Sequence, residues 1–350
     1  MKRLAATNVD RLSRRDFLKV TAGIGLSAAG MSLLEACGTQ PATPFAENAP
    51  LETTTIRLTT TPSICLAPQY LAGDLLKRDG FTDVQYFKTE VFKIESALTS
   101  GDADISMNFS AAGIMRVDAG DPLVMLAGVH VGCFLLFGND QIHKIDDLRG
   151  KTIPVPALGA GAHVFLVSML TYVGLDPDKE IHWVIQPIPE STELFKAGKV
   201  DAYLAFPPVA QELRAKKIGH VVVDSMMDDP WSQYFCCTVT ANREFAQKNP
   251  VATKRVLRAI LEASDTCALD PARAAKFLVD KRYANNYDYA LEAMQNIPYN
   301  RWREYDPQDT VIFYANRLRE AGLIKSNAND LVAKGTDWHF LNELKQEMKG

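Results

Sequence analysis

The chain has 350 residues, of which 47% are hydrophobic and 23% are charged, with 21 Gly and 18 Pro. This composition excludes a disordered, collagen-like or low-complexity protein, and the length favours two domains. The formal net charge of −4 gives no support to nucleic-acid binding, because a phosphate-binding surface normally carries a basic excess.

The first 37 residues have the pattern of a targeting segment rather than of a folded domain. Basic residues cluster around the sequence Ser-Arg-Arg-Asp-Phe-Leu-Lys at residues 13–19, and residues 20–34 are nearly uncharged and rich in Ala, Gly and Leu. This core is shorter than a comfortable membrane span and is typical of a signal peptide. The paired arginines followed by Phe-Leu-Lys resemble the twin-arginine export signal, which implies export of the folded chain by the twin-arginine translocase.

The segment after the signal core predicts a connection to the cell envelope. Residues 34–38, Leu-Glu-Ala-Cys-Gly, resemble a lipobox, in which Cys37 becomes the lipidated first residue of the mature protein. Glu35 departs from that pattern, so cleavage by an ordinary signal peptidase is the alternative. Residues 38–54 are polar and Pro-rich, as in a linker. We therefore expect a periplasmic protein, or one held on the outer face of the cytoplasmic membrane.

From residue 55 onward, strand patterns alternate with helix patterns. We expect strands at residues 55–61, 83–87, 103–107, 123–127, 132–137, 152–156, 182–185, 202–206, 220–224 and 235–240. We expect helices at residues 66–77, 92–98, 111–119, 145–148, 162–173, 191–197 and 211–216. Strands separated by helices predict parallel pairing with right-handed crossovers. From residue 243 to the end, the pattern is mostly that of amphipathic helix.

Five short phrases follow one another in a diagnostic order. They are ALTSGDAD at residues 97–104, AGDP at 119–122, IDDLRGKTI at 145–153, GLDP at 174–177 and AGKVDA at 197–202. In this order and spacing they resemble the nitrate/sulfonate/taurine-type substrate-binding proteins of ABC importers, which share a superfamily with binders of thiamine-pyrimidine precursors. The likeness spans about residues 55–280.

The resemblance implies an α/β, two-lobed type II periplasmic-binding-protein fold with two crossover hinge strands and a helical C-terminal region. Lobe 1 would comprise residues 55–131 plus 238–350, and lobe 2 residues 132–237, behind the signal segment 1–37 and the linker 38–54. The implied function is to capture a small sulfonate-, carboxylate- or heterocycle-like ligand between the lobes and deliver it to a membrane permease with its ATPase.

Two other functions stay open: a pyrimidine-synthase-like enzyme of the same superfamily, and an extracytoplasmic ligand sensor without transport. The six His residues show no His-x-x-x-His spacing, and no Gly-x-Ser-x-Gly elbow occurs. We therefore expect neither enzymatic activity nor a cofactor.

Candidate binding residues in lobe 1 follow its strands, because ligands of open α/β sheets lie beyond the carboxyl ends of the strands. Thr61, Pro62 and Ser63 follow the first strand, and Glu90 follows the second. The hydroxyl groups are equally suited to cap the next helix, so both roles stay open for Thr61 and Ser63. Tyr70, on the first helix, completes this set.

The loop after the third strand offers an aromatic side chain between two hydrogen-bonding ones. These residues are Asn108, Phe109 and Ser110. The pattern suits a planar or polar ligand. A buried Phe109 with Ser110 as a helix cap is the alternative.

The strongest candidate in lobe 2 is a Gly-containing loop that leads into a helix. It consists of Gly159, Ala160, Gly161, Ala162 and His163. The glycines allow close approach of the backbone to a ligand, and the free amides at a helix start attract an electronegative group. The family typically contacts its ligand through this loop. His163 could instead cap the helix.

Aromatic and sulfur-containing residues complete the candidate site. A second loop of lobe 2 has the sequence Ala-Phe-Pro-Pro at residues 205–208. Relatives that carry a glutamate before the first proline of this loop can pair it with a ligand amine. Here that position is Phe206, which indicates a stacking surface or a core residue. We expect segments 131–134 and 234–237 to be adjacent crossover strands, with Cys133 near Cys236 or Cys237 in a thiol-lined hinge floor.

The cysteines show no Cys-x-x-Cys spacing, and we expect the adjacent Cys236 and Cys237 to point to opposite faces of their strand. No metal site is therefore expected. A disulfide and reduced, buried thiols are both compatible with export.

Overall fold

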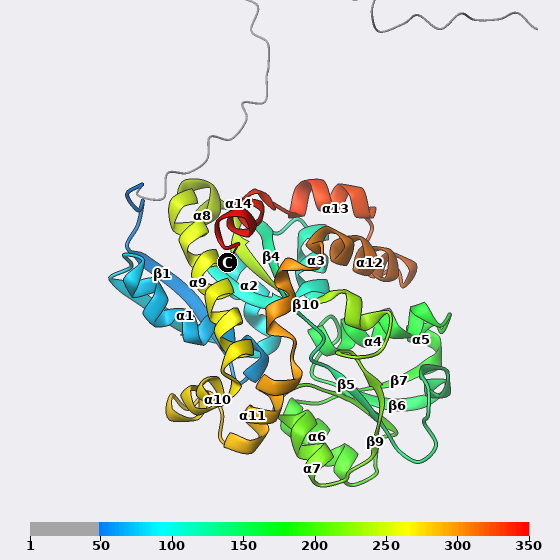
Figure 1. Ribbon diagram of the computed structural model, residues 1–350. Coiled ribbons are helices and arrows are strands. Elements are labelled where there is room, and N and C mark those ends of the chain that lie inside the picture. Colours follow the sequence, from blue (N-terminus) through cyan, green and yellow to red (C-terminus); the bar gives the residue numbers. More distant parts are fainter. Residues whose placement is uncertain (1–48, 350) are drawn as a thin grey trace, which may run out of the picture. The chain divides into compact units, whose positions relative to one another are not determined.

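The computed structural model describes residues 49–349, and these belong to one compact unit (Figure 1). The predicted signal segment, the lipidation site at Cys37 and most of the 38–54 linker lie outside the described residues.

Five strands form a first strand group. β1 (Thr55–Thr60) pairs in parallel with β2 (Asp83–Lys88), and β10 (Phe235–Asn242) lies between β3 (Ile105–Phe109) and β4 (Leu123–Val131), antiparallel to both. The connecting helices are η2 (Ile64–Leu66), α1 (Ala67–Arg78), η3 (Val91–Lys93), α2 (Ile94–Ser100) and α3 (Ser110–Asp118).

The other five strands form a second strand group. β5 (Leu135–Gly138) lies between β8 (Ala202–Ala205) and β9 (His220–Asp224), antiparallel to both, and β6 (Lys151–Val155) pairs in parallel with β7 (Ile181–Ile185). Its helices are η4 (Ile145–Leu148), α4 (Gly161–Tyr172), α5 (Pro177–Glu180), α6 (Ile188–Lys196), α7 (Val209–Ala215) and η5 (Trp231–Gln233).

The chain passes between the two strand groups twice, after β4 and before β10. Within residues 49–349, no strand of one group hydrogen-bonds to a strand of the other. The two passages lie side by side, because Phe235 at the start of β10 pairs with Val131 at the end of β4. The expected proximity of segments 131–134 and 234–237 is thereby confirmed.

Two expectations about the strands need correction. Parallel pairing holds for β1–β2 and β6–β7 but is wrong around β10 and β5, whose neighbours run antiparallel. The strand expected at residues 132–137 starts only at Leu135. Gly132 turns the chain with a φ of +51°, and a Cβ atom there would lie 2.4 Å from the Ser225 carbonyl oxygen, so only glycine fits this turn.

The C-terminal part is helical, as the amphipathic pattern predicts. Its helices are α8 (Arg243–Lys248), α9 (Pro250–Leu269), α10 (Pro271–Asp280), α11 (Tyr287–Asn296), η6 (Tyr299–Arg303), α12 (Pro307–Glu320), α13 (Ala328–Gly335) and α14 (His339–Glu347). Side chains of Asp270, Asn286 and Asp306 cap three of these helices. α9 packs on α1, whereas α12 packs on both α3 and α4 and so bridges the two strand groups.

None of the helices within residues 49–349 combines the length and the apolar character that crossing a membrane requires.

Candidate functional site

A cavity of about 60 Å³ lies where the two strand groups meet, and we call it the inner cavity. Its lining comes from both groups and from both crossover segments. The principal lining residues are Ser63, Cys65, Phe92, Glu95, Asn108, Phe109, Cys133, Phe134, Pro156, Gly159, Ala160, Gly161, Ala162, Phe206 and Cys237. The loop after β3 and the loop before α4, far apart in the sequence, therefore face one space.

Aromatic rings form much of the wall. Phe109 lies edge-on to Phe134, with ring centroids 5.4 Å apart, and Phe134 lies edge-on to Phe206 at 5.8 Å. Gly161 packs directly on this wall, since a Cβ atom on Gly161 would lie 3.3 Å from Cδ1 of Phe109. The wall can therefore stack on a planar ligand, as we expect for Phe206.

A buried carboxyl group is the main polar feature of the inner cavity. Asn108 donates from Nδ2 to Oε1 of Glu95 at 2.9 Å, and Oδ1 of Asn108 accepts from the Thr240 hydroxyl at 2.7 Å. Burial raises the pKa of Glu95 above its usual range, and the hydrogen bond from Asn108 opposes that shift. Asn108 is thus a positioning residue for Glu95.

Sequence reasoning missed Glu95 because the residue lies inside a helix rather than in a loop after a strand. One signal was present: Glu95 lies three positions before Leu98, and both are buried on the same helix face. A carboxylate on the apolar face of an amphipathic helix indicates a buried, and therefore candidate functional, group.

A larger open groove of about 980 Å³ adjoins the inner cavity, and the two share Val91, Phe92 and Phe206. We call it the outer groove. It contains four of the expected residues: Phe206, which both spaces share, and Thr61, Pro62 and Glu90. The Thr61 hydroxyl is buried and has no hydrogen-bond partner among the described residues. Glu90 forms an ion pair with Lys93 at 2.8 Å.

Four expected site residues line neither space. The Tyr70 hydroxyl donates to the Thr61 carbonyl oxygen at 2.7 Å, and the Ser110 hydroxyl donates to the Phe235 carbonyl oxygen at 2.8 Å. His163 accepts a hydrogen bond, and Cys236 lies in the sulfur cluster described below. The capping alternatives for Ser63 and Ser110 are wrong, since neither side chain caps a helix.

His163 holds the loop before α4 in place. Gly159, at a φ of +79°, donates its amide to Nδ1 of His163 at 3.1 Å, and Trp183 packs edge-on to the imidazole with ring centroids 4.8 Å apart. Only the neutral imidazole can accept this bond at Nδ1. Burial lowers the pKa of His163 from 6.5 to about 4.

We expect this histidine to make the protein less stable in mild acid. Between pH 6.5 and pH 4 the unfolded chain binds the proton at this histidine more readily than the folded chain does. The free energy of unfolding therefore decreases by about 3 kcal/mol as the pH is lowered through this range. His163→Asn keeps an acceptor near the Nδ1 position but cannot titrate there. Urea unfolding at pH 7 and pH 4 should show a smaller loss for this variant than for the wild type. Equal losses would contradict the assignment.

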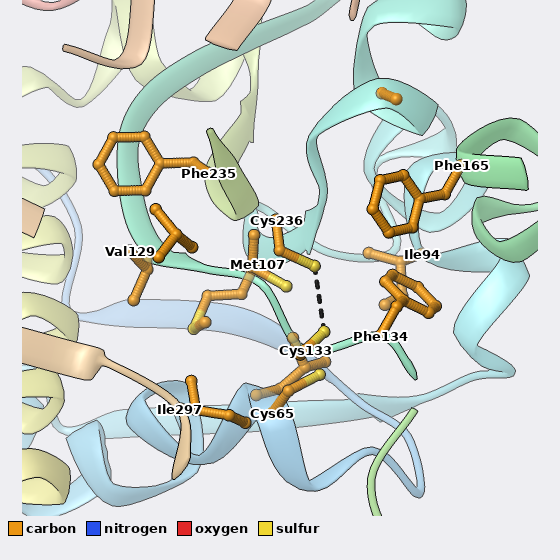
Figure 2. Packing of buried hydrophobic residues seen from close by; sticks show 14 of the residues in the cluster. Cys65, Ile94, Met107, Val129, Cys133, Phe134, Phe165, Phe235, Cys236 and Ile297 are labelled. Carbon is orange, nitrogen blue, oxygen red and sulfur yellow. Dashed lines mark hydrogen bonds between the residues drawn. The ribbon is translucent and has the colours of Figure 1, made fainter. Parts of the chain in front are cut away.

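Four cysteines from three segments meet at the floor of the inner cavity. The sulfur atoms of Cys133 and Cys236 lie 3.0 Å apart, which confirms the expected proximity, and Figure 2 shows both directed into the same part of the core as Cys65. The expectation that Cys236 and Cys237 point to opposite faces is wrong: both sulfur atoms lie within 4.8 Å of that of Cys133.

A β-bulge explains this arrangement. The register of β10 against β4 shifts between Phe235 and Cys237, so Cys236 is the extra residue of a bulge, which re-aims side chains that would otherwise alternate. The five cysteines within residues 49–349 are all free thiols. Hydrogen bonds from the Cys133, Cys236 and Cys65 thiols lower the pKa of Cys237, against the effect of desolvation.

Solved structures identify the fold. The periplasmic nitrate-binding protein NrtA from Synechocystis PCC 6803 superposes with a TM-score of 0.72 at 14% identity, over 85% of this chain and 90% of that one. The aliphatic sulphonate binding protein SsuA from Escherichia coli gives a TM-score of 0.65 at 18% identity, over 79% and 90%. The protein thus has the periplasmic-binding-protein fold, as the five sequence phrases predict.

The chain belongs to the NMT1-like family, whose model matches residues 50–279. A nitrate/nitrite binding protein NrtA from Nostoc is 24% identical over 84% of this chain and 76% of its own length. The taurine-binding periplasmic protein of Escherichia coli is 27% identical over 51% and 55%. A Saccharomyces cerevisiae 4-amino-5-hydroxymethyl-2-methylpyrimidine phosphate synthase also matches, at 22% identity over 60% and 68%.

Proposed function

We propose that the protein is the extracytoplasmic solute-binding component of an ABC importer. The observation that carries this proposal is the inner cavity, whose lining comes from both strand groups and from both crossover segments. In the proposed mechanism the two groups are the lobes of a clamp: residues 55–131 plus 238–350 face residues 132–237. A ligand that contacts both lobes favours the closed over the open state and is then presented to the permease.

The lining favours a neutral or cationic ligand over an anion. No Lys or Arg side chain is present among the described residues that line the inner cavity, whereas the Glu95 carboxyl group is. A sulfonate or carboxylate would meet this acid without a compensating cation, which is unfavourable at a buried site. Of the three expected ligand classes, a small heterocycle with a hydrogen-bond donor for Glu95 and a flat face for Phe109 and Phe206 fits the chemistry best.

Export and anchoring are part of the same proposal. The twin-arginine pattern at residues 13–19 would direct the folded chain out of the cytoplasm, and Cys37 would anchor it to the membrane if the lipobox is used. The periplasmic relatives support an extracytoplasmic location. Fractionation of cells that produce the full chain locates the protein directly.

A ligand panel with recovery of the bound molecule tests the function. Thermal unfolding is measured with neutral and cationic heterocycles, carboxylates and sulfonates, because a ligand that binds only the folded state raises the melting temperature. We expect a rise with a member of the first group and recovery of that compound unchanged. A new product would support the synthase-like alternative, and uptake that survives deletion of the gene would support the sensor alternative.

A further inference from the structure

Five soft donor groups converge in the core beneath the inner cavity. The sulfur atoms of Cys65 and Cys237 and a ring nitrogen of His130 all lie within 4.8 Å of one another, and the sulfur atoms of Cys133 and Cys236 are close to that of Cys237. All five side chains are buried. They come from η2, β4, the β4–β5 crossover and β10, so no local spacing in the sequence indicates the cluster.

His130 has a nitrogen atom available in this cluster. Nδ1 lies 3.1 Å from the Gly132 carbonyl oxygen, so Nδ1 carries the proton and donates, and Nε2 keeps its lone pair. Nε2 is buried and has no nitrogen or oxygen hydrogen-bond partner among the described residues, and the imidazole interacts with the Cys65 and Cys237 thiols. Tyr299 packs edge-on to the ring, with centroids 5.2 Å apart, and fixes its orientation. A metal-bound histidine has the same arrangement, with its second nitrogen bound to a carbonyl oxygen.

The donor types select the metal. Thiolate sulfur and imidazole nitrogen prefer borderline or soft cations such as Zn²⁺, whereas Mg²⁺ and Ca²⁺ require oxygen ligands. A divalent ion would also balance the charge of two buried thiolates, which would otherwise be costly. The two thiols would release their protons to solvent on binding.

Distances decide which groups act as ligands. Tetrahedral zinc with bonds of about 2.3 Å places two sulfur ligands about 3.8 Å apart. The sulfur atoms of Cys133 and Cys236, at 3.0 Å, are too close for such a pair and are placed as a hydrogen-bonded thiol pair. Cys65, His130 and Cys237 remain as a set of three.

We propose that Cys65, His130 and Cys237 form a binding site for one thiophilic metal ion of the Zn²⁺ type. Cys65 and Cys237 line the inner cavity, so the fourth coordination position faces the space in which a ligand would lie. A ligand with a nitrogen, oxygen or sulfur donor would complete the coordination shell. Metal binding itself does not require that the protein serve a transporter.

Zinc titration of the full chain tests the site. The protein is purified with a non-chelating reductant, stripped of metal, and titrated with Zn²⁺ in competition with a chromophoric chelator. We expect one equivalent to bind to the wild type. Cys237→Ser, Cys65→Ser and His130→Ala should each weaken binding by at least about a hundredfold.

Two matched variants serve as controls. Cys236→Ser alters a buried cysteine next to the proposed ligands, and Cys267→Ser alters a buried cysteine on α9 that is not part of the cluster. Both should bind zinc within about threefold of the wild type. If Cys236→Ser loses as much affinity as Cys237→Ser, or if the three ligand variants bind as the wild type does, the assignment is overturned.

Cobalt gives a readout that does not depend on the folding of any variant. Co²⁺ bound to the wild type by two thiolates should show a thiolate-to-metal charge-transfer absorption that one equivalent of Zn²⁺ removes. A reduced, folded wild type that shows no such band, or that leaves zinc with the chelator, overturns the proposal.

Discussion

Gly161→Leu is expected to weaken ligand binding by a thousandfold or more, about 4 kcal/mol, while the chain still folds. Gly161 is the first residue of α4 and lines the inner cavity against Phe109. A leucine side chain would occupy much of a space of about 60 Å³. The backbone at residue 161 does not have a left-handed φ, whereas that at Gly159 does, so the substitution adds volume without backbone strain.

The measurement is equilibrium binding of the compound that the thermal panel identifies, with circular dichroism as the check on folding. Ala215→Leu is the matched control, because it adds the same side chain at an exposed position of α7. The control should bind as the wild type does. A folded Gly161→Leu protein with wild-type affinity would show that the ligand binds elsewhere.

Ser225→Ala is expected to lower the free energy of unfolding by about 4 kcal/mol. The buried Ser225 hydroxyl oxygen accepts from the amides of Cys133 and Phe134, at 3.2 and 3.0 Å, and the hydroxyl donates to the Phe134 carbonyl oxygen at 2.8 Å. Alanine would leave the buried amides of Cys133 and Phe134 without their partner, at roughly 1–3 kcal/mol for each. The Phe134 carbonyl oxygen keeps its hydrogen bond from the Ser225 amide.

Urea unfolding of Ser225→Ala beside Ser168→Ala measures this effect. Ser168 is equally buried, but its hydroxyl donates only to the Val164 carbonyl oxygen one turn earlier in α4. Its replacement should change stability by less than about 1 kcal/mol, since such bonds compete with the helix. A similar, small loss for both variants would mean that Ser225 does not hold the crossover.

The sequence was informative where structure is local. Alternating and helical patterns located most strands and helices, and the Gly159–Ala162 loop was predicted to be functional because it joins a strand to a helix. This loop and Asn108 do line one cavity in the structure. Pairing was harder to predict, because β10 joins β3 and β4 across more than 100 residues and no local pattern specifies the direction of that partner.

The features that the sequence did not predict depend on tertiary contacts. Glu95 becomes a cavity group only when Asn108 and Thr240 meet it. The sulfur cluster needs a bulge at Cys236, so the expectation from adjacent spacing, that Cys236 and Cys237 face opposite sides, is wrong, whereas the expected proximity of Cys133 is confirmed. The Glu95 carboxyl group and the sulfur cluster are polar or reactive groups in the core. A sequence pattern indicates that such positions are buried, but not which other groups they contact.

A crystal structure of the protein with the compound selected by the panel tests the clamp most directly. We expect the compound between the Phe109 and Phe206 rings, next to Gly161 and hydrogen-bonded to the Glu95 carboxyl group. Density for the compound at another surface, with none in the inner cavity between Phe109 and Phe206, would contradict the account.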